Sequence, residues 1–438
     1  MAVNIVTNLL AFILVLGFLV FAHEAGHFLL AKLFKVRVLV FSFGFGKRLF
    51  GFKKGDTDYR VSLVPLGGYV RMAGDTPEEE HDGSPDEYLS KPKWQRFLIL
   101  VAGPGINVLI AVVFLAGLFM IGTEVYRDQP AVLGDVVKGK PAEAAGLRAG
   151  DRITKANGDE IRTFQDLRLA ISMNATTPIN LEVLRDGKAL PMTLVPERQM
   201  TDYGVAGFAG IAVSIDPEVG KVLKDSAAER AGLKTGDRIV AINGQPVQRL
   251  NVLDTLIDPK KPAPIQLQVQ RQGSMVDLTL PAMKADETSY PGFTQPTVVR
   301  KLSPSQAVRQ SVIENVKMVK YTVLTIGRLF RGRGSVKELS GPISIARISG
   351  EMLRTGWIAV ISLMASISLQ LGIMNLLPVP VLDGGHIFIL LVEGIARRDL
   401  SIQVKERIQQ LGFVALAVLM IFVLYNDVIQ NVMLMRRG

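Results

Sequence analysis

A His-Glu-x-x-His motif lies inside the first apolar stretch of the chain, at His23, Glu24 and His27. On a helix, residues four apart share one face, so both imidazoles can bind a single zinc ion. Glu24 lies beside them and can accept a proton from water that the zinc activates. This arrangement is typical of enzymes that hydrolyse amide bonds. The alternative interpretation is a pair of buried core histidines.

The motif lies within a predicted membrane span. From Ile5 to Leu30 the sequence is almost wholly apolar, which is long enough for a helix to cross a bilayer. A carboxylate near the middle of such a helix costs roughly 2.5–3.5 kcal/mol on insertion scales, so an ionisable group there indicates a functional site.

A catalytic zinc site of this kind needs a third protein ligand. Asp383 is the best candidate, because it follows an apolar segment that two prolines and two glycines interrupt between Asn375 and His386. Irregular backbone at membrane depth is tolerated only where it is buried in protein or lines a wet cavity. His81, in an acidic loop, is a poorer candidate. As alternatives, Asp383 caps the following helix, and His386 is an outer group of the site or an unrelated interfacial residue.

Together, these motifs resemble the site-2 protease family of intramembrane zinc metalloproteases. The second motif reads Asn-x-x-Pro-x-Pro-x-Leu-Asp-Gly-Gly at residues 375–385. Four further stretches, at 41–47, 66–72, 102–107 and 339–346, resemble the bacterial regulator-of-sigma-E protease branch. The metal and base positions show no departure from the family pattern. The resemblance therefore implies an active zinc endopeptidase.

The same resemblance implies a substrate class and a set of positioning residues. Substrates are expected to be single-span membrane proteins cut within or beside the transmembrane segment, such as anti-sigma factors and remnant signal peptides. The enzyme would act in regulated proteolysis at the bacterial inner membrane. The residues expected to position the substrate are Asn375, Pro378, Gly67, Gly68 and Asn107. A simple link between helices is the alternative role for Asn107.

Composition supports a membrane protein with room for a soluble part. The chain has 438 residues, of which 48% are hydrophobic, and it contains no cysteine. Disulfides and thiolate metal sites are therefore excluded. The net charge is +10, but the basic residues cluster beside apolar segments. This pattern favours anionic lipid headgroups over nucleic acid.

The predicted fold class is a multi-pass α-helical membrane protein with four transmembrane helices, a membrane-associated β-hairpin or sheet, and two tandem PDZ domains. The predicted segments are transmembrane helix 1 (1–33), the β region (34–96), transmembrane helix 2 (97–122), the PDZ domains (126–200 and 205–285), a linker with an amphipathic helix (286–354), transmembrane helix 3 (355–387), a cytoplasmic interfacial segment (388–408) and transmembrane helix 4 (409–430).

The β region is predicted to dip into the membrane near the site. Arg37 to Phe43 and Asp58 to Val64 alternate or are rich in β-branched and aromatic residues, with turn residues between them. The resemblance implies that this element receives the substrate as an added strand. An ordinary cytoplasmic loop is the alternative.

The PDZ prediction depends on an internal repeat. The pattern Ala-Gly-Leu-x-x-Gly-Asp-x-Ile recurs with a constant offset, since 232 minus 146 and 237 minus 151 both give 86. Asn-Gly turns at 157 and 243 follow the same offset. The pattern is similar to bacterial PDZ domains, which bind peptides or chain ends. Phe208, Gly210 and Ile211 resemble the peptide groove of the second module.

The distribution of Lys and Arg predicts the topology. Basic loops between spans one and two, and between three and four, should face the cytoplasm. The PDZ pair then lies outside, in the periplasm, and the ligands meet in the cytoplasmic half of the bilayer. Arg436 and Arg437 argue weakly for the opposite orientation. The helix from Ser305 to Phe330 is expected at the membrane surface, with packing on the PDZ pair as the alternative.

Two other functional classes compete with the protease. A membrane-anchored PDZ scaffold would have a structural zinc or none, and it would need no base at Glu24. An ion or metal transporter would need a continuous chain of polar groups in the membrane, and the four spans offer few beyond this cluster. Within the protease hypothesis, the PDZ pair either captures chain ends or excludes bulky substrates. We favour exclusion.

Overall fold

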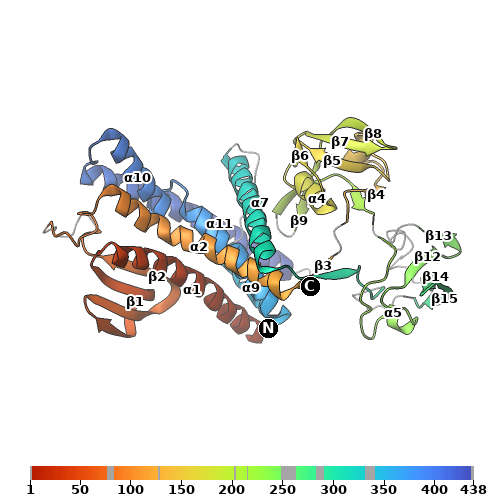
Figure 1. Ribbon diagram of the computed structural model, residues 1–438, viewed down its shortest axis with the longest axis horizontal. Helices are drawn as coiled ribbons and strands as arrows, with labels where there is room; N and C mark the ends of the chain where they lie inside the picture. Colours follow the sequence, from red (N-terminus) through yellow and green to blue (C-terminus); the bar gives the residue numbers. More distant parts are fainter. Residues whose placement is uncertain are drawn as a thin grey trace. The chain divides into compact units, whose positions relative to one another are not determined.

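The computed structural model describes residues 2–75, 83–126, 129–201, 204–214, 216–247, 263–282, 291–330 and 341–435. The chain divides into a helical unit, Met1–Ile121 with Lys301–Gly438, and a β unit, Gly122–Arg300 (Figure 1). Within the described residues, four helices of the helical unit are long and apolar enough to cross a membrane. They are Ile5–Leu33, Lys93–Ile121, Trp357–Asn375 and Gln403–Ile429. The four predicted spans are thereby found as helices.

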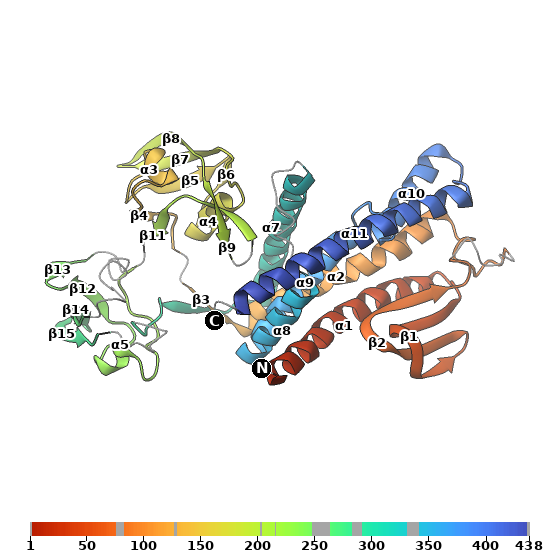
Figure 2. The same ribbon diagram turned by 180° about the vertical axis from the view of Figure 1, so that it is seen from behind.

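Several helices pack against α2 (Lys93–Ile121). This helix contacts α1 (Ala2–Leu33), α9 (Trp357–Asn375) and α10 (Asp383–Ala396), as Figure 2 shows. The approach of α1 to α2 is close, because a Cβ on Gly26 would lie 2.4 Å from the carbonyl oxygen of Ala102. The last helix, α11 (Ile402–Met435), contains the fourth span.

Two more helices lie in the described part of the helical unit. The predicted amphipathic helix is α7 (Pro304–Phe330), and it packs against α2 and α9. Thr322 accepts a hydrogen bond from Gln370 of α9 at 2.9 Å. The second, α8 (Pro342–Thr355), was not predicted as a separate helix; it packs against α1. Asp427 of α11 accepts hydrogen bonds from the first backbone N–H groups of α8.

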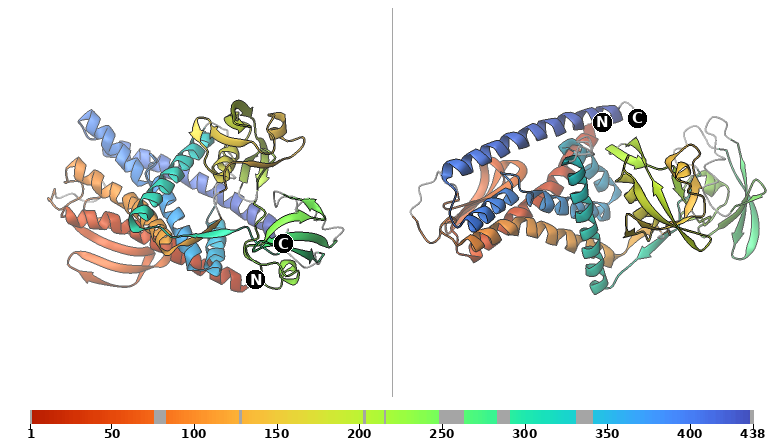
Figure 3. Two further views of the ribbon diagram at one scale, coloured as in Figure 1. Left: turned by 45° about the vertical axis from the view of Figure 1, so that its right-hand side comes forward. Right: turned by 90° about the horizontal axis from the view of Figure 1, so that it is seen from above.

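The predicted β region forms a sheet beside α1, made from the bent strands β1 (Val38–Lys54) and β2 (Thr57–Met72) (Figure 3). Residues 38–43 of β1 pair with 68–72 on one side, and residues 40–45 pair with 58–64 on the other. Residues 48–54 then pair with 57–62. The order of segments across the sheet is therefore 68–72, 38–45, 57–64 and 48–54. Gly44 and Gly46, at φ 90° and 87°, allow the bend in β1.

The β unit contains two modules with the same sheet order, and the predicted repeat is confirmed. The first sheet runs β6-β5-β7-β8 and the second β13-β12-β14-β15. The first module comprises β4 (Leu133–Val136), α3 (Pro141–Ala144), β5 (Arg152–Ala156), β6 (Asp159–Glu160), α4 (Phe164–Ser172), β7 (Ile179–Arg185), β8 (Lys188–Leu194), β9 (Glu197–Thr201), β10 (Gly204–Phe208) and β11 (Ile211–Val213). The second comprises α5 (Ala227–Arg230), β12 (Arg238–Ile242), β13 (Gln245–Pro246), β14 (Ile265–Arg271) and β15 (Ser274–Leu280).

Equivalent ion pairs sit at the same place in both modules. Arg185 donates two hydrogen bonds of 2.7 Å to Asp151, and Arg271 does the same to Asp237. Each aspartate side chain is 1% exposed. Burial raises the pKa of Asp151, but the hydrogen bonds from Arg185 and from the backbone of Arg148 outweigh it, so the pKa lies below its ordinary value.

The predicted boundary between the modules is wrong, because a later segment closes the first module. β11 pairs with β4, and Ala209 is buried in the core of the first module, with Ile211 packed against it. The backbone N–H of Val137 donates to the oxygen of Gly210 at 2.8 Å. Phe208, Gly210 and Ile211 therefore belong to the first module and not to the second.

The second module is closed in the same way by residues that were predicted to be linker. The N–H groups of Leu223 and Ala228 donate to Gly292 and Pro291, and Phe293 packs against the second core. Beyond this loop, β16 (Thr297–Arg300) pairs with β3 (Thr123–Tyr126). The β unit thus begins and ends in a two-stranded stem.

Candidate active site

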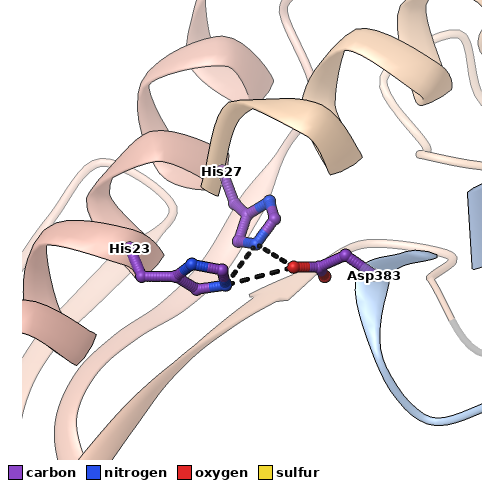
Figure 4. A group of neighbouring side chains, drawn as sticks. All are labelled: His23, His27 and Asp383. Carbon is purple, nitrogen blue, oxygen red and sulfur yellow. Dashed lines mark hydrogen bonds and ion pairs between the residues drawn. The ribbon is translucent and has the colours of Figure 1, made fainter. Parts of the chain in front are cut away.

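Three predicted ligands converge between α1 and the start of α10. The Nε2 atoms of His23 and His27 lie 3.2 Å apart, and Asp383 Oδ2 lies 3.1 Å from the first and 3.5 Å from the second (Figure 4). Both histidines are 7% exposed. Among the described residues, this is the one cluster of such groups close enough to hold a metal ion.

These distances fit a tetrahedral zinc site. Ligand atoms about 2.0–2.1 Å from a tetrahedral zinc lie roughly 3.3 Å from one another. The three observed separations, 3.1, 3.2 and 3.5 Å, bracket that value. Two imidazoles and one carboxylate also leave a fourth position for water or substrate, as catalytic zinc requires.

The outer ring nitrogens fix the orientation of both histidines. His27 Nδ1 donates to the carbonyl oxygen of Ile99 at 2.8 Å, so its Nε2 lone pair is directed at the cluster. His23 Nδ1 lies 3.2 Å from Asn107 Nδ2. Asn107 Oδ1 is buried and has no hydrogen-bond partner among the described residues. Turning this amide over lets Oδ1 accept the Nδ1 proton, which leaves Nε2 of His23 for a metal.

Gly103 of α2 makes room for both rings. A Cβ at this position would lie 2.3 Å from His27 Nε2 and 2.9 Å from His23 Cε1. Only a residue without a side chain allows α2 to lie against the two imidazoles. The backbone of α2 at Gly103 therefore forms a wall of the site against the two imidazoles.

Glu24 opens onto the same cavity as the ligands. The cavity has a volume of about 260 Å³, and its walls come from α1, α2, α9, the sheet and the start of α10. The lining residues are Val20, His23, Glu24, Phe45, Gly67, Gly68, Asn107, Leu371, Asn375, Val381, Leu382 and Asp383. A carboxylate here has an open space beside a metal position, as a general base for water requires.

Four of the five predicted positioning residues line this cavity, and one does not. Asn375 Nδ2 lies 3.4 Å from His23 Nε2, and a Cβ on Gly68 would lie 3.3 Å from Cγ of Glu24. Gly67 and Asn107 also line the cavity. Pro378 is exposed in the bend between α9 and α10 and does not line it.

The bend between α9 and α10 aims Asp383 at the histidines. Asp383 is the first residue of α10, and no side chain caps that helix, so the capping role is not observed. Val381 has φ 100°, a strained conformation for a β-branched residue and one that clusters at functional sites. Gly384 and Gly385 allow α10 to fold back on the bend, since a Cβ on either would lie 2.3 Å from a backbone oxygen.

His386 does not join the metal cluster. It lines a neighbouring cavity of about 450 Å³, together with Gln409, Gln410 and Phe413 of α11. Val381 lies in the wall of both this cavity and the catalytic cavity. His81, the poorer ligand candidate, lies outside the described residues.

Comparison with known proteins places the chain in a family. Residues 11–419 match the Peptidase family M50. The chain is 32% identical to the regulator of sigma-E protease RseP of Salmonella typhimurium over 97% of its own length and 99% of the relative. It is 33% identical to RseP of Escherichia coli K12 over 96% and 98%. A protein of Vibrio cholerae named as a zinc metalloprotease is 30% identical over 97% and 99%.

The chain belongs to the Peptidase family M50, the site-2 protease family. It is a zinc metalloendopeptidase of the membrane, in agreement with its four apolar helices.

Proposed function

We propose that this enzyme cleaves within or beside the transmembrane segment of single-span membrane proteins, with His23, His27 and Asp383 as zinc ligands and Glu24 as the general base. The observation that carries the assignment is the near-tetrahedral spacing of the three ligand atoms. The position of His23 and His27 inside a helix that can span a membrane supports an intramembrane reaction.

The chain's own groups divide the chemical work. Zinc, when bound, supplies Lewis-acid activation of water and of the scissile carbonyl. Glu24 takes the proton of the attacking water and returns it to the leaving amine. Asn107 and the carbonyl of Ile99 hold the two imidazoles in place. Asn375 lies where its amide can hydrogen-bond the substrate backbone or the developing oxyanion.

The edge of the sheet formed by residues 68–72 offers the substrate a strand to pair with. Residues 68–72 pair with β1 on one side only among the described residues, and Gly67 and Gly68 line the cavity. A transmembrane helix that unwinds and pairs with this edge presents an extended backbone beside Glu24.

The relatives' names suggest the physiological setting. Two of them are named regulators of sigma-E protease. We therefore assign this chain substrates of the anti-sigma factor type, with remnant signal peptides as a further class. The site then lies in the cytoplasmic half of a bacterial inner membrane and the β unit in the periplasm. Reporters fused after Lys54 and after Arg398 should report cytoplasm, and one near Gly187 should report the periplasm. A periplasmic signal at Lys54 would overturn this orientation.

The Glu24→Gln variant tests the catalytic assignment. It should retain zinc and lose hydrolysis of a model membrane peptide, because glutamine keeps the volume of the side chain but cannot accept the proton. His23→Ala and Asp383→Ala should lose both zinc and hydrolysis. Full activity of Asp383→Ala would contradict the ligand assignment. Full activity of Glu24→Gln would favour a structural zinc site in a scaffold protein.

The two modules of the β unit are proposed to be PDZ domains that exclude bulky substrates. Phe208, Gly210 and Ile211 form the peptide-binding loop of the first module, where Lys140 lies 5.7 Å from the Phe208 ring. The test compares long and short substrates with the intact enzyme and with one lacking residues 126–300, the range that includes both closing loops. Exclusion predicts that the deleted enzyme cuts long substrates. Continued rejection of long substrates by a folded deletion variant would refute it. Loss of cleavage on altering Gly210 alone would favour capture.

A further inference from the structure

An apolar cavity lies on the flank of α1 that faces away from the metal cluster. Its volume is about 340 Å³, and its lining is almost wholly aromatic and aliphatic. The lining residues are Phe21, Phe41, Phe43, Phe50, Gly51, Phe52, Tyr59, Arg60 and Val61. We name this the aromatic cavity. It lies between α1 and the sheet segments 38–45, 57–64 and 48–54.

The aromatic cavity is separate from the active site. At about 100° per residue, Phe21 and Phe28 lie roughly 140–160° around α1 from His23. Across the sheet, the segment 68–72 lies at the active site, whereas 48–54 is at the opposite edge. None of its lining residues is shared with the catalytic cavity. A peptide paired with the free edge of residues 68–72 would lie beyond that strand, on the side away from segments 57–64 and 48–54.

The aromatic rings of the cavity wall pack on one another, although the side chains of segment 48–54 are exposed. Phe41 packs on Phe21 and Phe28 with ring centroids 5.2 and 4.8 Å apart, and Phe52 stacks on Tyr59 at 5.2 Å. Phe50 and Phe52 are nevertheless 64% and 62% exposed. Aromatic surface exposed beside a membrane span needs an apolar partner.

Positive charge gathers at one end of the aromatic cavity. Lys53 and Lys54 are exposed at the turn next to Phe52, and Lys32 Nζ donates to Thr57 in the same turn at 2.8 Å. Asp56 shares the turn, which leaves a net positive charge. Asp58 is engaged elsewhere, with Arg48 at 3.2 Å and Arg60 at 3.7 Å.

Charge and apolar surface are arranged along the membrane normal. Lys32 is next to the last residue of the candidate span Ile5–Leu33, so it lies at headgroup level. Phe21 is 11 residues earlier, or about 16 Å deeper along the helix. The molecule therefore offers a hydrocarbon slot below and ammonium groups above, the complement of an anionic phospholipid.

We propose that the aromatic cavity binds one acyl chain of an anionic phospholipid whose phosphate pairs with Lys53 and Lys54. The proposal depends on α1 spanning the membrane and not on the chemistry at His23. The bound acyl chain fills the aromatic cavity between α1 and sheet segment 48–54. It thereby holds the sheet against the helix that carries the histidines.

Photolabelling tests this site on the full-length protein. The protein is reconstituted in phosphatidylcholine vesicles that contain a trace of phosphatidylglycerol with a diazirine in its acyl chain. A matched diazirine phosphatidylcholine serves as the neutral probe. Peptide mapping should find the anionic probe on residues 41–61, several-fold above the neutral probe. Equal labelling of this segment by both probes would overturn the proposal.

Three variants separate headgroup from acyl recognition. Lys53→Gln with Lys54→Gln should lower labelling by phosphatidylglycerol about fivefold per lysine, since each lysine near an anionic surface contributes about 1 kcal/mol. The control variant Lys47→Gln should change labelling by phosphatidylglycerol little, because this exposed lysine lies at the end of segment 48–54 away from Lys53 and Lys54. Val61→Trp should fill the slot and abolish labelling by both probes, while zinc content shows that the protein is folded. Unchanged labelling in Val61→Trp, or protection by a substrate peptide instead of by unlabelled phosphatidylglycerol, would refute the lipid site.

Discussion

Replacing Gly103 by alanine tests whether the contact between α2 and the two histidines decides zinc binding. The new Cβ would lie 2.3 Å from His27 Nε2, whereas ordinary contact begins near 3.4 Å. The ring must therefore withdraw by about 1 Å, because the Cβ is fixed to the helix backbone. Functional zinc–ligand distances vary by only about 0.2 Å. A 1 Å misplacement costs roughly 100-fold in rate, or about 2.7 kcal/mol. We expect zinc affinity to fall by at least tenfold and peptide hydrolysis by about 100-fold.

Gly105→Ala is the matched control. This glycine lies in the same helix, and a Cβ there would meet nothing within 4 Å among the described residues. Alanine is intrinsically about 1 kcal/mol better than glycine in a helix, so this variant should keep full zinc content and stability. Zinc is measured by competition with a chromogenic chelator, and hydrolysis with a model membrane peptide. Normal zinc affinity and activity in Gly103→Ala would refute the steric argument.

Three further variants test contacts that hold the scaffold. Arg185→Ala should destabilise the first module at pH 7, because it leaves the Asp151 carboxylate, whose side chain is 1% exposed, without its guanidinium partner. In the native module the pKa of Asp151 is depressed, so its contribution is present above the unfolded pKa and is lost as pH falls through the folded one. The difference in the free energy of unfolding between variant and wild type, measured by hydrogen exchange, should therefore become smaller below about pH 4. A difference that stays constant with pH would contradict this. Lys405→Ala should cost about 3–5 kcal/mol, since Glu393 is fully buried and pairs with it at 2.7 Å. The double variant Lys405→Met with Glu393→Met should recover most of that loss. A melting temperature no higher than that of Lys405→Ala would argue against a buried ion pair between Lys405 and Glu393. Asp427→Ala should loosen α8 by about 1–2 kcal/mol through loss of its cap, whereas Asp427→Asn keeps an acceptor; equal exchange rates in α8 for both would exclude capping.

The convergence of the two histidines was predictable because their spacing is local. His23 and His27 are one helical turn apart, and any helix through them places both rings on one face. Asp383 was predictable for a chemical reason. It is a carboxylate on a stretch where prolines and glycines interrupt the helix after an apolar segment. By contrast, the roles of Ile99 and Gly103 rest on a backbone oxygen and on a missing side chain. The Gly103-Pro104-Gly105 sequence predicts close approach by another helix, but no sequence motif reveals the hydrogen bond from His27 to the backbone of Ile99.

The errors concern elements whose partners are remote in sequence. Phe208 to Ile211 follow the sheet of the first module but close its core, so reading the chain in order assigned them to the next module. A signal was present: Gly210-Ile211 and Gly292-Phe293 recur at an offset of 82, since 292 minus 210 is 82. The helix α8 was missed because its 14 residues are only weakly apolar. Its packing on α1 and its cap by α11 come from tertiary contacts.

On the proposed ligand assignment, the separation of the three ligands along the chain also determines when the enzyme becomes active. His23 and His27 are made among the first residues, but the carboxylate that completes the site comes 360 residues later, since 383 minus 23 is 360. At about 5–20 residues per second, the ribosome needs roughly 20–70 s to cover that distance. During this interval the nascent chain offers a pair of histidines and a base without their third ligand. Newly inserted membrane helices nearby are therefore spared until the chain is nearly complete.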